Sequence, residues 1–147
     1  MNERFETFTV LIAKINRNIK KIKNQEMAEY GFRSAHISCL YYLYSADFLT
    51  ATDLCERCEE DKATISRALG FLEENGFITC ESKSAKRYKS PLMLTEKGRE
   101  AGGKIFEKVN RVLEDVGVGL TDEKREEFYR SLTIISDNLD KITKEIK

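Results

Sequence analysis

The side chains best able to do chemistry lie together in one short segment, residues 61–75, DKATISRALGFLEEN. At about 100° per residue, Ile65, Leu69 and Leu72 share one side of a helix, and small or polar residues occupy the other. Arginine can donate two hydrogen bonds to guanine, hydroxyls can bond phosphate or a base edge, and a methyl can contact thymine. Lysine near a helix N-terminus also favours phosphate. The segment therefore predicts noncovalent recognition of double-stranded DNA by Lys62, Ala63, Thr64, Ser66 and Arg67.

The preceding segment, residues 50–60 (TATDLCERCEE), supplies a helix for this one to pack against. Leu54 and Cys58 are four residues apart, so they form an apolar face, and Thr50 or Thr52 can cap the helix. A short acidic link joins the two helices. The pair is typical of a helix-turn-helix, in which the second helix stays slim enough to enter a major groove about 12 Å wide.

A basic hairpin is expected immediately after this pair. Residues 77–82 (FITCES) and 92–94 (LML) read as short strands, and residues 83–90 (KSAKRYKS) join them without an acidic residue. Lys83, Lys86, Arg87 and Lys89 lie in this tip. A basic hairpin at this place is a wing, which tracks the phosphate backbone or inserts arginine into the minor groove.

Both ends of the chain carry long apolar seams at helical spacing. Residues spaced three or four apart form one seam from Phe5 to Ile22 and another from Phe128 to Ile146, the latter after Thr121 as N-cap. A small central domain cannot cover seams of this length, so we expect them to form a homodimer; packing within one chain is the alternative. The expected dimerisation residues are Phe5, Phe8, Ile12, Ile15, Phe128, Leu132, Ile135, Leu139 and Ile142.

These elements predict a single domain over residues 1–147, mainly α with a small β-hairpin wing. Residues 1–30 and 118–147 are the expected dimerisation helices, and residues 34–99 are the expected winged helix-turn-helix. A helix over 34–46, with Ser34 as its cap, begins that part, and a long helix over 95–117, capped by Thr95, links it to the C-terminal helix.

The net charge of zero argues at first against a polyanionic partner, but the charge is segregated. Residues 62–99 carry eight Lys or Arg against four Asp or Glu, whereas residues 46–61 carry one against six. A local basic patch matters more for DNA binding than the total. No apolar run approaches the roughly 20 residues of a membrane span, and the start lacks a secretory pattern, so we expect a cytoplasmic protein with no membrane partner.

The basic run near the N-terminus is open to several interpretations. Its members are Lys14, Arg17, Lys20, Lys21 and Lys23. A solvated helix face is favoured, and a second DNA contact or a site for an anionic effector is the alternative. Tyr41, Tyr42 and Tyr44 are expected in the core, with a ligand pocket left open. Gly102 and Gly103 allow either close packing or a bend.

Cys55 and Cys58 have the C-x-x-C spacing, for which structural thiols, a redox pair and half a zinc site all remain open. Structural thiols are favoured because Cys58 occupies a packing position. A zinc site would need His36 and Cys39 from another helix, and we expect no metal and no cofactor. There is no glycine-rich phosphate loop, no nucleophile and base pair, and a single histidine, so we expect no enzyme.

The segment DLCERCEEDKATISRALGFLEENGFI, the basic wing and LTEKGRE (94–100), between long terminal helices, resemble a MarR-type winged-helix transcriptional regulator over essentially the whole chain. The resemblance implies a homodimeric repressor on a pseudo-palindromic operator, released by a small ligand or an oxidant. It puts Lys62, Thr64, Ser66 and Arg67 on recognition-helix positions and Arg87 at the wing tip.

The sequence departs from the family pattern at the helix turn and in the wing. Glu59 and Glu60 stand where the turn usually holds a glycine and an apolar residue, and Ala85 stands where an acid usually precedes the wing arginine. These departures are the main support for the alternative function, a winged-helix module that binds a protein and has weak or no specific DNA binding.

Overall fold

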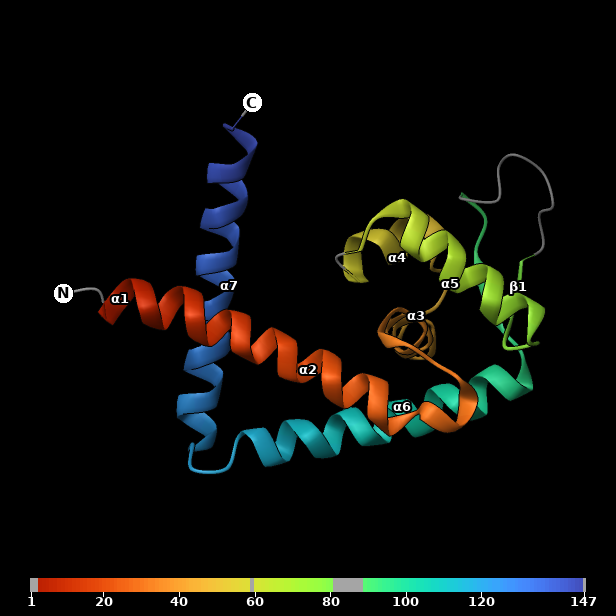
Figure 1. The fold of residues 1–147 in the computed structure, drawn as a ribbon, viewed down its shortest axis with the longest axis horizontal. Coiled ribbons are helices and arrows are strands. Elements are labelled where there is room, and N and C mark those ends of the chain that lie inside the picture. Colours follow the sequence, from red (N-terminus) through yellow and green to blue (C-terminus); the bar gives the residue numbers. More distant parts are fainter. Residues whose placement is uncertain (1–2, 59, 81–88, 147) are drawn as a thin grey trace. The chain divides into compact units, whose positions relative to one another are not determined.

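The computed structural model describes residues 3–58, 60–80 and 89–146, which form two compact units, residues 1–109 and 110–147 (Figure 1). The elements follow one another as α1 (Glu3–Glu6), a π-helical turn η1 (Thr7–Leu11), α2 (Ile12–Glu26), a 3-10 turn η2 (Ala28–Tyr30), α3 (Ser34–Ser45), α4 (Ala51–Cys58), α5 (Lys62–Glu74), β1 (Ile78–Cys80), β2 (Leu92–Leu94), α6 (Glu96–Val116) and α7 (Asp122–Lys144). The fold is mainly helical with one small hairpin, as the sequence predicts.

The first helical run extends without a break from Glu3 to Glu26, because Glu6 and Leu11 at the junctions have right-handed helical dihedrals. Met27, which is 1% exposed, ends the run with φ −123° and ψ 28°. The expected element over residues 1–30 is therefore a helix to Glu26 followed by the turn η2. Gly31, at φ 74°, then reverses the chain into α3.

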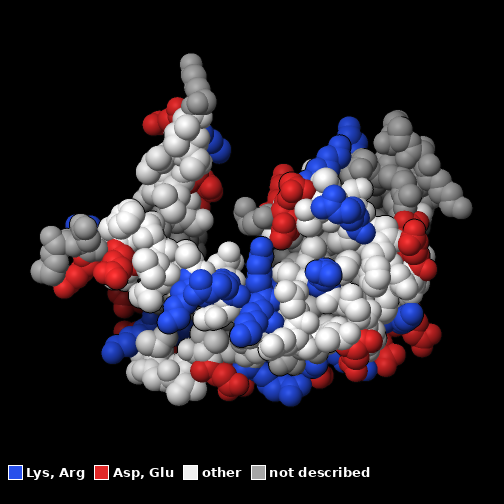
Figure 2. All heavy atoms as spheres, viewed as in Figure 1, with Lys and Arg blue, Asp and Glu red and all other residues white. Residues whose placement is uncertain are grey.

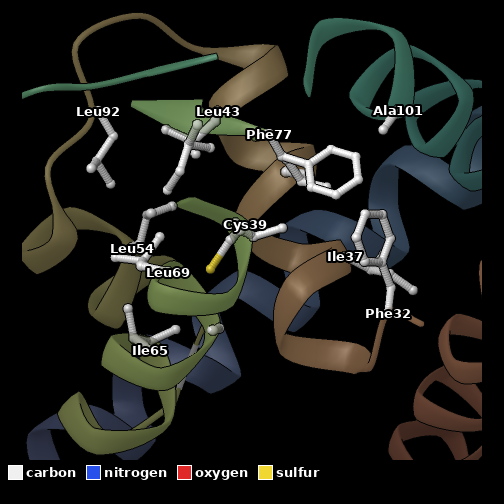
Figure 3. Close-up of a cluster of buried hydrophobic side chains, with 14 of the residues drawn as sticks. Phe32, Ile37, Cys39, Leu43, Leu54, Ile65, Leu69, Phe77, Leu92 and Ala101 are labelled. Carbon is white, nitrogen blue, oxygen red and sulfur yellow. The ribbon is translucent and has the colours of Figure 1, made fainter. Parts of the chain in front are cut away.

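The hydrophobic core lies where α3, α4, α5, the hairpin and the first turns of α6 meet. Figure 3 shows Cys39 and Leu43 of α3 converging with Leu54 of α4 and Leu69 of α5, all of them buried. Leu40, Leu54 and Leu72 are fully excluded from solvent. This core fixes the angle between α4 and α5, so it determines how the outer face of α5 is presented.

The hairpin alternates buried and exposed residues as a half-buried sheet should. Ile78 pairs with Leu94 and Cys80 with Leu92 in antiparallel register. The Leu92 N–H donates to the Leu49 carbonyl at 2.9 Å, which anchors β2 to the loop before α4. The described part of the first strand begins one residue later than expected, after Phe77, and residues 81 and 82 lie outside the described residues.

The LTEKGRE segment forms the attachment of α6 to the end of α5. The Thr95 hydroxyl donates to the Gly76 carbonyl at 2.6 Å and accepts the Gly98 N–H at 3.0 Å, so Thr95 caps the helix as predicted. Lys97 Nζ donates to the Asn75 carbonyl at 2.8 Å. The sequence allows either close packing or a bend at Gly102. The structure shows close packing, because a Cβ on Gly102 would lie 3.0 Å from the Tyr44 Cβ.

The second unit contains the end of α6, a turn and α7. α6 ends at Val116 and α7 begins at Asp122, so the expected boundary between residues 117 and 118 is a turn over 117–121. Gly119 in this turn has φ 94°. The Thr121 hydroxyl accepts the Lys124 N–H at 3.2 Å, which confirms the predicted N-cap. The described residues of α7 include none that is buried in a single chain.

Candidate nucleic-acid interface

Asp61 fixes the start of α5. Its Oδ1 accepts the Thr64 N–H at 2.7 Å, and it has the extended backbone of an N-cap. Hydrogen bonds from the Thr64 N–H and hydroxyl lower the pKa of Asp61, so its carboxylate is ionised at neutral pH. The acidic link in the sequence thus contributes a cap to the helix that carries the candidate reading residues.

The two faces of α5 differ as the sequence indicates. Ile65 and Leu72 are at most 1% exposed and face the core. The structure places the candidate reading residues on the other side, half-buried at Thr64 and exposed at Lys62, Ala63, Ser66 and Arg67. The Arg67 guanidinium makes a long contact of 3.4 Å with the Thr64 hydroxyl, which leaves its donors available to a base edge.

Gly70 and Phe71 complete this surface in different ways. A Cβ on Gly70 would have no neighbour within 4 Å, so nothing in the described chain requires a glycine there, and its effect is to keep the outer face slim. Phe71, which helical spacing puts beside the outer face, is half-buried because its ring packs at a tilt against His36, with centroids 4.4 Å apart. Phe71 therefore supports the helix from the side.

His36 holds the N-terminus of α3 rather than acting as a base. Its Nδ1 accepts the Arg33 N–H at 2.8 Å, while Asn24 Oδ1 accepts the Ser34 N–H at 2.9 Å. The expected cap, Ser34, is instead the first helical residue, and Arg33 is the N-cap. Burial, and next the charge of Arg33, lowers the pKa of His36. The neutral ring keeps the lone pair that the cap needs.

A cavity of about 410 Å³ lies between α2, the N-terminus of α3 and α5. Its lining brings together three cations, Lys20 of α2, Arg33 just before α3 and Arg67 of α5, with Glu60 as the acid. Figure 2 shows Lys and Arg side chains gathered over α2 and over the α5 region, with acidic side chains near the α4–α5 junction. The sequence favours a solvated face for Lys20 and leaves a second DNA contact or an anionic effector site as the alternative. Its local spacing does not connect Lys20 to Arg67.

The wing is described only at its base. Lys89 is exposed, and Lys83, Lys86 and Arg87 lie outside the described residues. A second cavity, of about 240 Å³, lies between α5 and the strands, with Ser66 and Gly70 in its lining. The recognition face and the base of the wing therefore adjoin each other.

The cysteines lie in or against the core. Cys39 is buried, and Cys55 and Cys58 are half-buried against it. All four cysteines are free thiols. Within the described residues, no group of three His, Cys, Asp or Glu side chains is arranged to hold a metal ion.

Known proteins resemble this chain over nearly its whole length. Residues 36–113, more than half of the chain, match the family model described as winged helix DNA-binding domain. The HTH-type transcriptional regulator YwoH of Bacillus subtilis is 27% identical over 121 residues, covering 80% of this chain and 88% of that protein. BilQ of Clostridioides difficile, also an HTH-type transcriptional regulator, is 21% identical and covers 92% of each chain.

Solved structures agree with this fold. NMB1585, a MarR family regulator from Neisseria meningitidis, superposes with a TM-score of 0.83 at 19% identity over 99% of both chains. A MarR transcriptional regulator from Methanosarcina mazei gives 0.79 at 25% identity, covering 93% of this chain and 92% of that one. The Staphylococcus aureus MepR–DNA complex gives 0.78 at 21% identity, covering 90% and 97%.

The relatives named as transcriptional regulators belong to a class of proteins that are not enzymes. No helix in the described residues is long and apolar enough to cross a membrane. With the matched family, the order of elements and the two-faced α5 in agreement, the chain belongs to the winged helix DNA-binding family and has the fold of MarR family regulators.

Proposed function

We propose that the protein is a homodimeric repressor that binds a pseudo-palindromic operator and is modulated by a small ligand or an oxidant. Each protomer reads the major groove with Lys62, Ala63, Thr64, Ser66 and Arg67, and contacts the adjacent backbone or minor groove with Lys83, Lys86, Arg87 and Lys89. The observation that carries the proposal is the outer face of α5, which is slim and basic at its N-terminal half while its inner face is locked into the core. The repressor role rests on the family resemblance.

The dimer is supported by apolar side chains that a single chain leaves exposed. Phe5 is 69% exposed and Ile15 54% in the first helical run, and Phe128 is 51% and Ile142 56% in α7. A large exposed apolar seam is typical of a surface that another subunit covers. We assign residues 1–30 and 118–147 to dimerisation, residues 34–99 to reading DNA and residues 95–117 to the link. Two-fold symmetry then accounts for a pseudo-palindromic operator.

An anionic effector is supported by the cavity between α2, α3 and α5. Lys20, Arg33 and Arg67 line it, so a negatively charged ligand of small size gains attraction from three cations. Arg67 is also a proposed reading residue. A ligand held there removes Arg67 from the groove, so it weakens DNA binding by direct competition for that side chain.

Fluorescence anisotropy tests the proposal. Wild-type protein is titrated onto DNA from upstream of its own gene and onto scrambled DNA, beside an Arg67→Ala/Arg87→Ala double variant and a Lys124→Ala control on α7. We expect salt-sensitive, sequence-preferring binding that the double variant loses, while the control keeps it. The slope of log K against log salt should report several phosphate contacts. Expression of a reporter gene placed downstream of the same DNA should rise when the gene for the protein is deleted.

The alternative is a winged-helix module that binds a protein, and one observation favours it. Glu60 and Asp61 place two acids at the start of the recognition helix, where they oppose phosphate. Equal, weak binding to both DNAs that the double variant leaves unchanged would support this alternative and contradict groove reading.

A further inference from the structure

The first helical run is joined to the core of its unit at its last turn. Every residue from Glu3 to Lys21 is exposed in the single chain, and the first half-buried residues are Ile22 and Lys23. Met27, which ends the run, is 1% exposed. Residues four apart lie on one side of a helix, so Lys23 and Met27 mark the side that meets the core. The long exposed part of the run, with its apolar seam, is therefore held mainly at one end.

Two side chains of this last turn bond the beginning of α3. Lys23 Nζ donates to the Ser38 hydroxyl at 3.0 Å, and the Ser34 N–H donates to Asn24 Oδ1 at 2.9 Å. Ser38 is 8% exposed, so water does not readily replace its partner if the bond is lost. The Ser34 N–H is one of the helix N-terminal donors that have no partner within the helix. We call these two hydrogen bonds the α2–α3 latch.

The latch acts on the helix against which the recognition helix packs. Ile37 and Leu40 of α3 are 3% and 0% exposed, and they share one core with Ile65 and Leu72 of α5. A close-packed core transmits a displacement instead of absorbing it, so α3 and α5 move together. A tilt of α2 at the latch therefore becomes a tilt between the apolar seam of the first run and the outer face of α5.

The helical run is long enough for a small tilt to matter. Ile15 of the seam lies two turns before Lys23, which is about 12 Å along a helix. A tilt of about 10° displaces a group roughly 20 Å from the hinge by about 3.5 Å, close to the rise of about 3.4 Å per base pair. The half-sites of a dimer's operator lie about 34–36 Å apart, or multiples of this, along the duplex. A tilt of this size thus exchanges one half-site spacing for the next.

We propose that Lys23 and Asn24 are positioning residues that determine which half-site spacing the dimer accepts, because they fix α2 against Ser38 and Ser34 of α3. The proposal rests on the homodimer and the pseudo-palindromic operator proposed above. With the latch intact, DNA that has one base pair added or removed between its half-sites should bind at least about tenfold more weakly than the preferred DNA. With the latch broken, this discrimination should fall below about threefold, because tilted arrangements become accessible.

Fluorescence anisotropy on duplexes of three spacings tests the specificity. Each duplex carries two copies of the half-site selected by the wild type, at the preferred spacing or with one base pair more or fewer. Lys23→Met and Ser38→Ala each remove one partner of the same bond, and Lys21→Met removes the same charge from an exposed position of the same helix. We expect both latch variants and their double variant to lose the discrimination by a similar factor, while Lys21→Met retains it.

A uniform loss of affinity at all three spacings, with the wild-type ratio retained, would mean that the bond only stabilises the fold, and would overturn the proposal. So would a double variant whose loss is the sum of the two single losses. Circular dichroism and sedimentation equilibrium establish that each variant folds and associates as the wild type does. If Lys23→Met does not fold, Asn24→Ala makes the same comparison, because it breaks the other bond at an exposed position.

A measurement without DNA separates the latch from the proposed function. Nitroxide labels attached at positions 14 and 74 through a ketone-bearing unnatural amino acid lie on α2 and α5 and leave the four cysteines unlabelled. Labelled chains are diluted with unlabelled protein, so that pulsed electron paramagnetic resonance measures the distance within one protomer. We expect a narrow distribution in the wild type and Lys21→Met, and a broader one in Lys23→Met and Ser38→Ala. Equal widths would overturn the latch, whereas the expected broadening with no sequence-preferring DNA binding by the wild type would contradict the proposed function alone.

Discussion

Gly98 of α6 packs directly on the backbone of Phe77, so that a Cβ on Gly98 would lie 1.9 Å from the Phe77 carbonyl oxygen. The same oxygen accepts the Thr95 N–H at 3.1 Å. α6 therefore starts in contact with the chain that leads into β1, and no side chain fits between the two. The glycine of the LTEKGRE segment is required by this close approach.

Gly98→Ala should therefore lower the free energy of unfolding by about 3 kcal/mol, because the added methyl meets backbone that cannot turn aside. Gly103→Ala is the matched control in the same helix, since its Cβ would lie 3.6 Å from the Tyr44 ring, an ordinary contact. Urea denaturation followed by circular dichroism measures both. Equal stabilities for the two variants would show that the contact at Gly98 is not limiting.

Gly70→Ala should separate stability from DNA binding. The site is open, and alanine is favoured over glycine within a helix, so the free energy of unfolding should rise by about 0.5–1 kcal/mol. If the outer face of α5 enters the major groove, the added methyl should at the same time weaken operator binding. Urea denaturation and anisotropy on one preparation measure the two effects. A more stable variant with undiminished affinity would place Gly70 outside the interface.

The pH dependence of the protein's stability should reveal the protonation of His36. Its pKa is lowered by burial and then by Arg33, so the unfolded chain takes up a proton near about pH 6.5 that the folded chain resists. The neutral ring therefore makes its full contribution to folding stability above that pH, and this contribution is lost as the pH falls below it. His36→Gln keeps an acceptor for the Arg33 N–H but does not titrate.

We expect the melting temperature of the wild type to fall more than that of His36→Gln between about pH 7.5 and about pH 6, above the range in which ordinary carboxylates titrate. Differential scanning calorimetry at the two pH values makes the comparison. Parallel shifts in both proteins would mean that another group is responsible.

Leu132→Glu should convert the proposed dimer to a monomer, because a charge in an apolar seam loses hydration that the interface does not replace. Leu132 is 39% exposed in the single chain. Thr133→Glu adds the same charge on another side of α7, away from the seam, and should leave the dimer intact. Sedimentation equilibrium measures both masses. A dimeric Leu132→Glu variant would remove α7 from the interface.

The helix-turn-helix, the hairpin base and the caps at Thr95 and Thr121 follow from local patterns, and the structure confirms them. Periodicity and capping depend on residues within about four positions, so a single sequence contains what is needed. The prediction of Ser34 as the cap of α3 was wrong, because the hydrogen-bond acceptor at the start of this helix is the side chain of His36, an unusual residue at that position.

One feature of the candidate site cannot be predicted from local spacing. The cavity brings Lys20 of α2 and Arg67 of α5 into one lining. This depends on how separate helices pack, which no local spacing encodes.

The hydrogen bonds from Thr95 to Gly76 and from Lys97 to Asn75 also mean that the tip of the wing can be replaced by another sequence. Both bonds lie outside the tip, so they hold α5 to α6 at the base of the hairpin whatever sequence joins Cys80 to Leu92. Loop closure costs little more as a loop lengthens. Tips of other lengths and charges can therefore be grafted onto this frame, and a single scaffold can present a range of minor-groove contacts while its recognition helix stays the same.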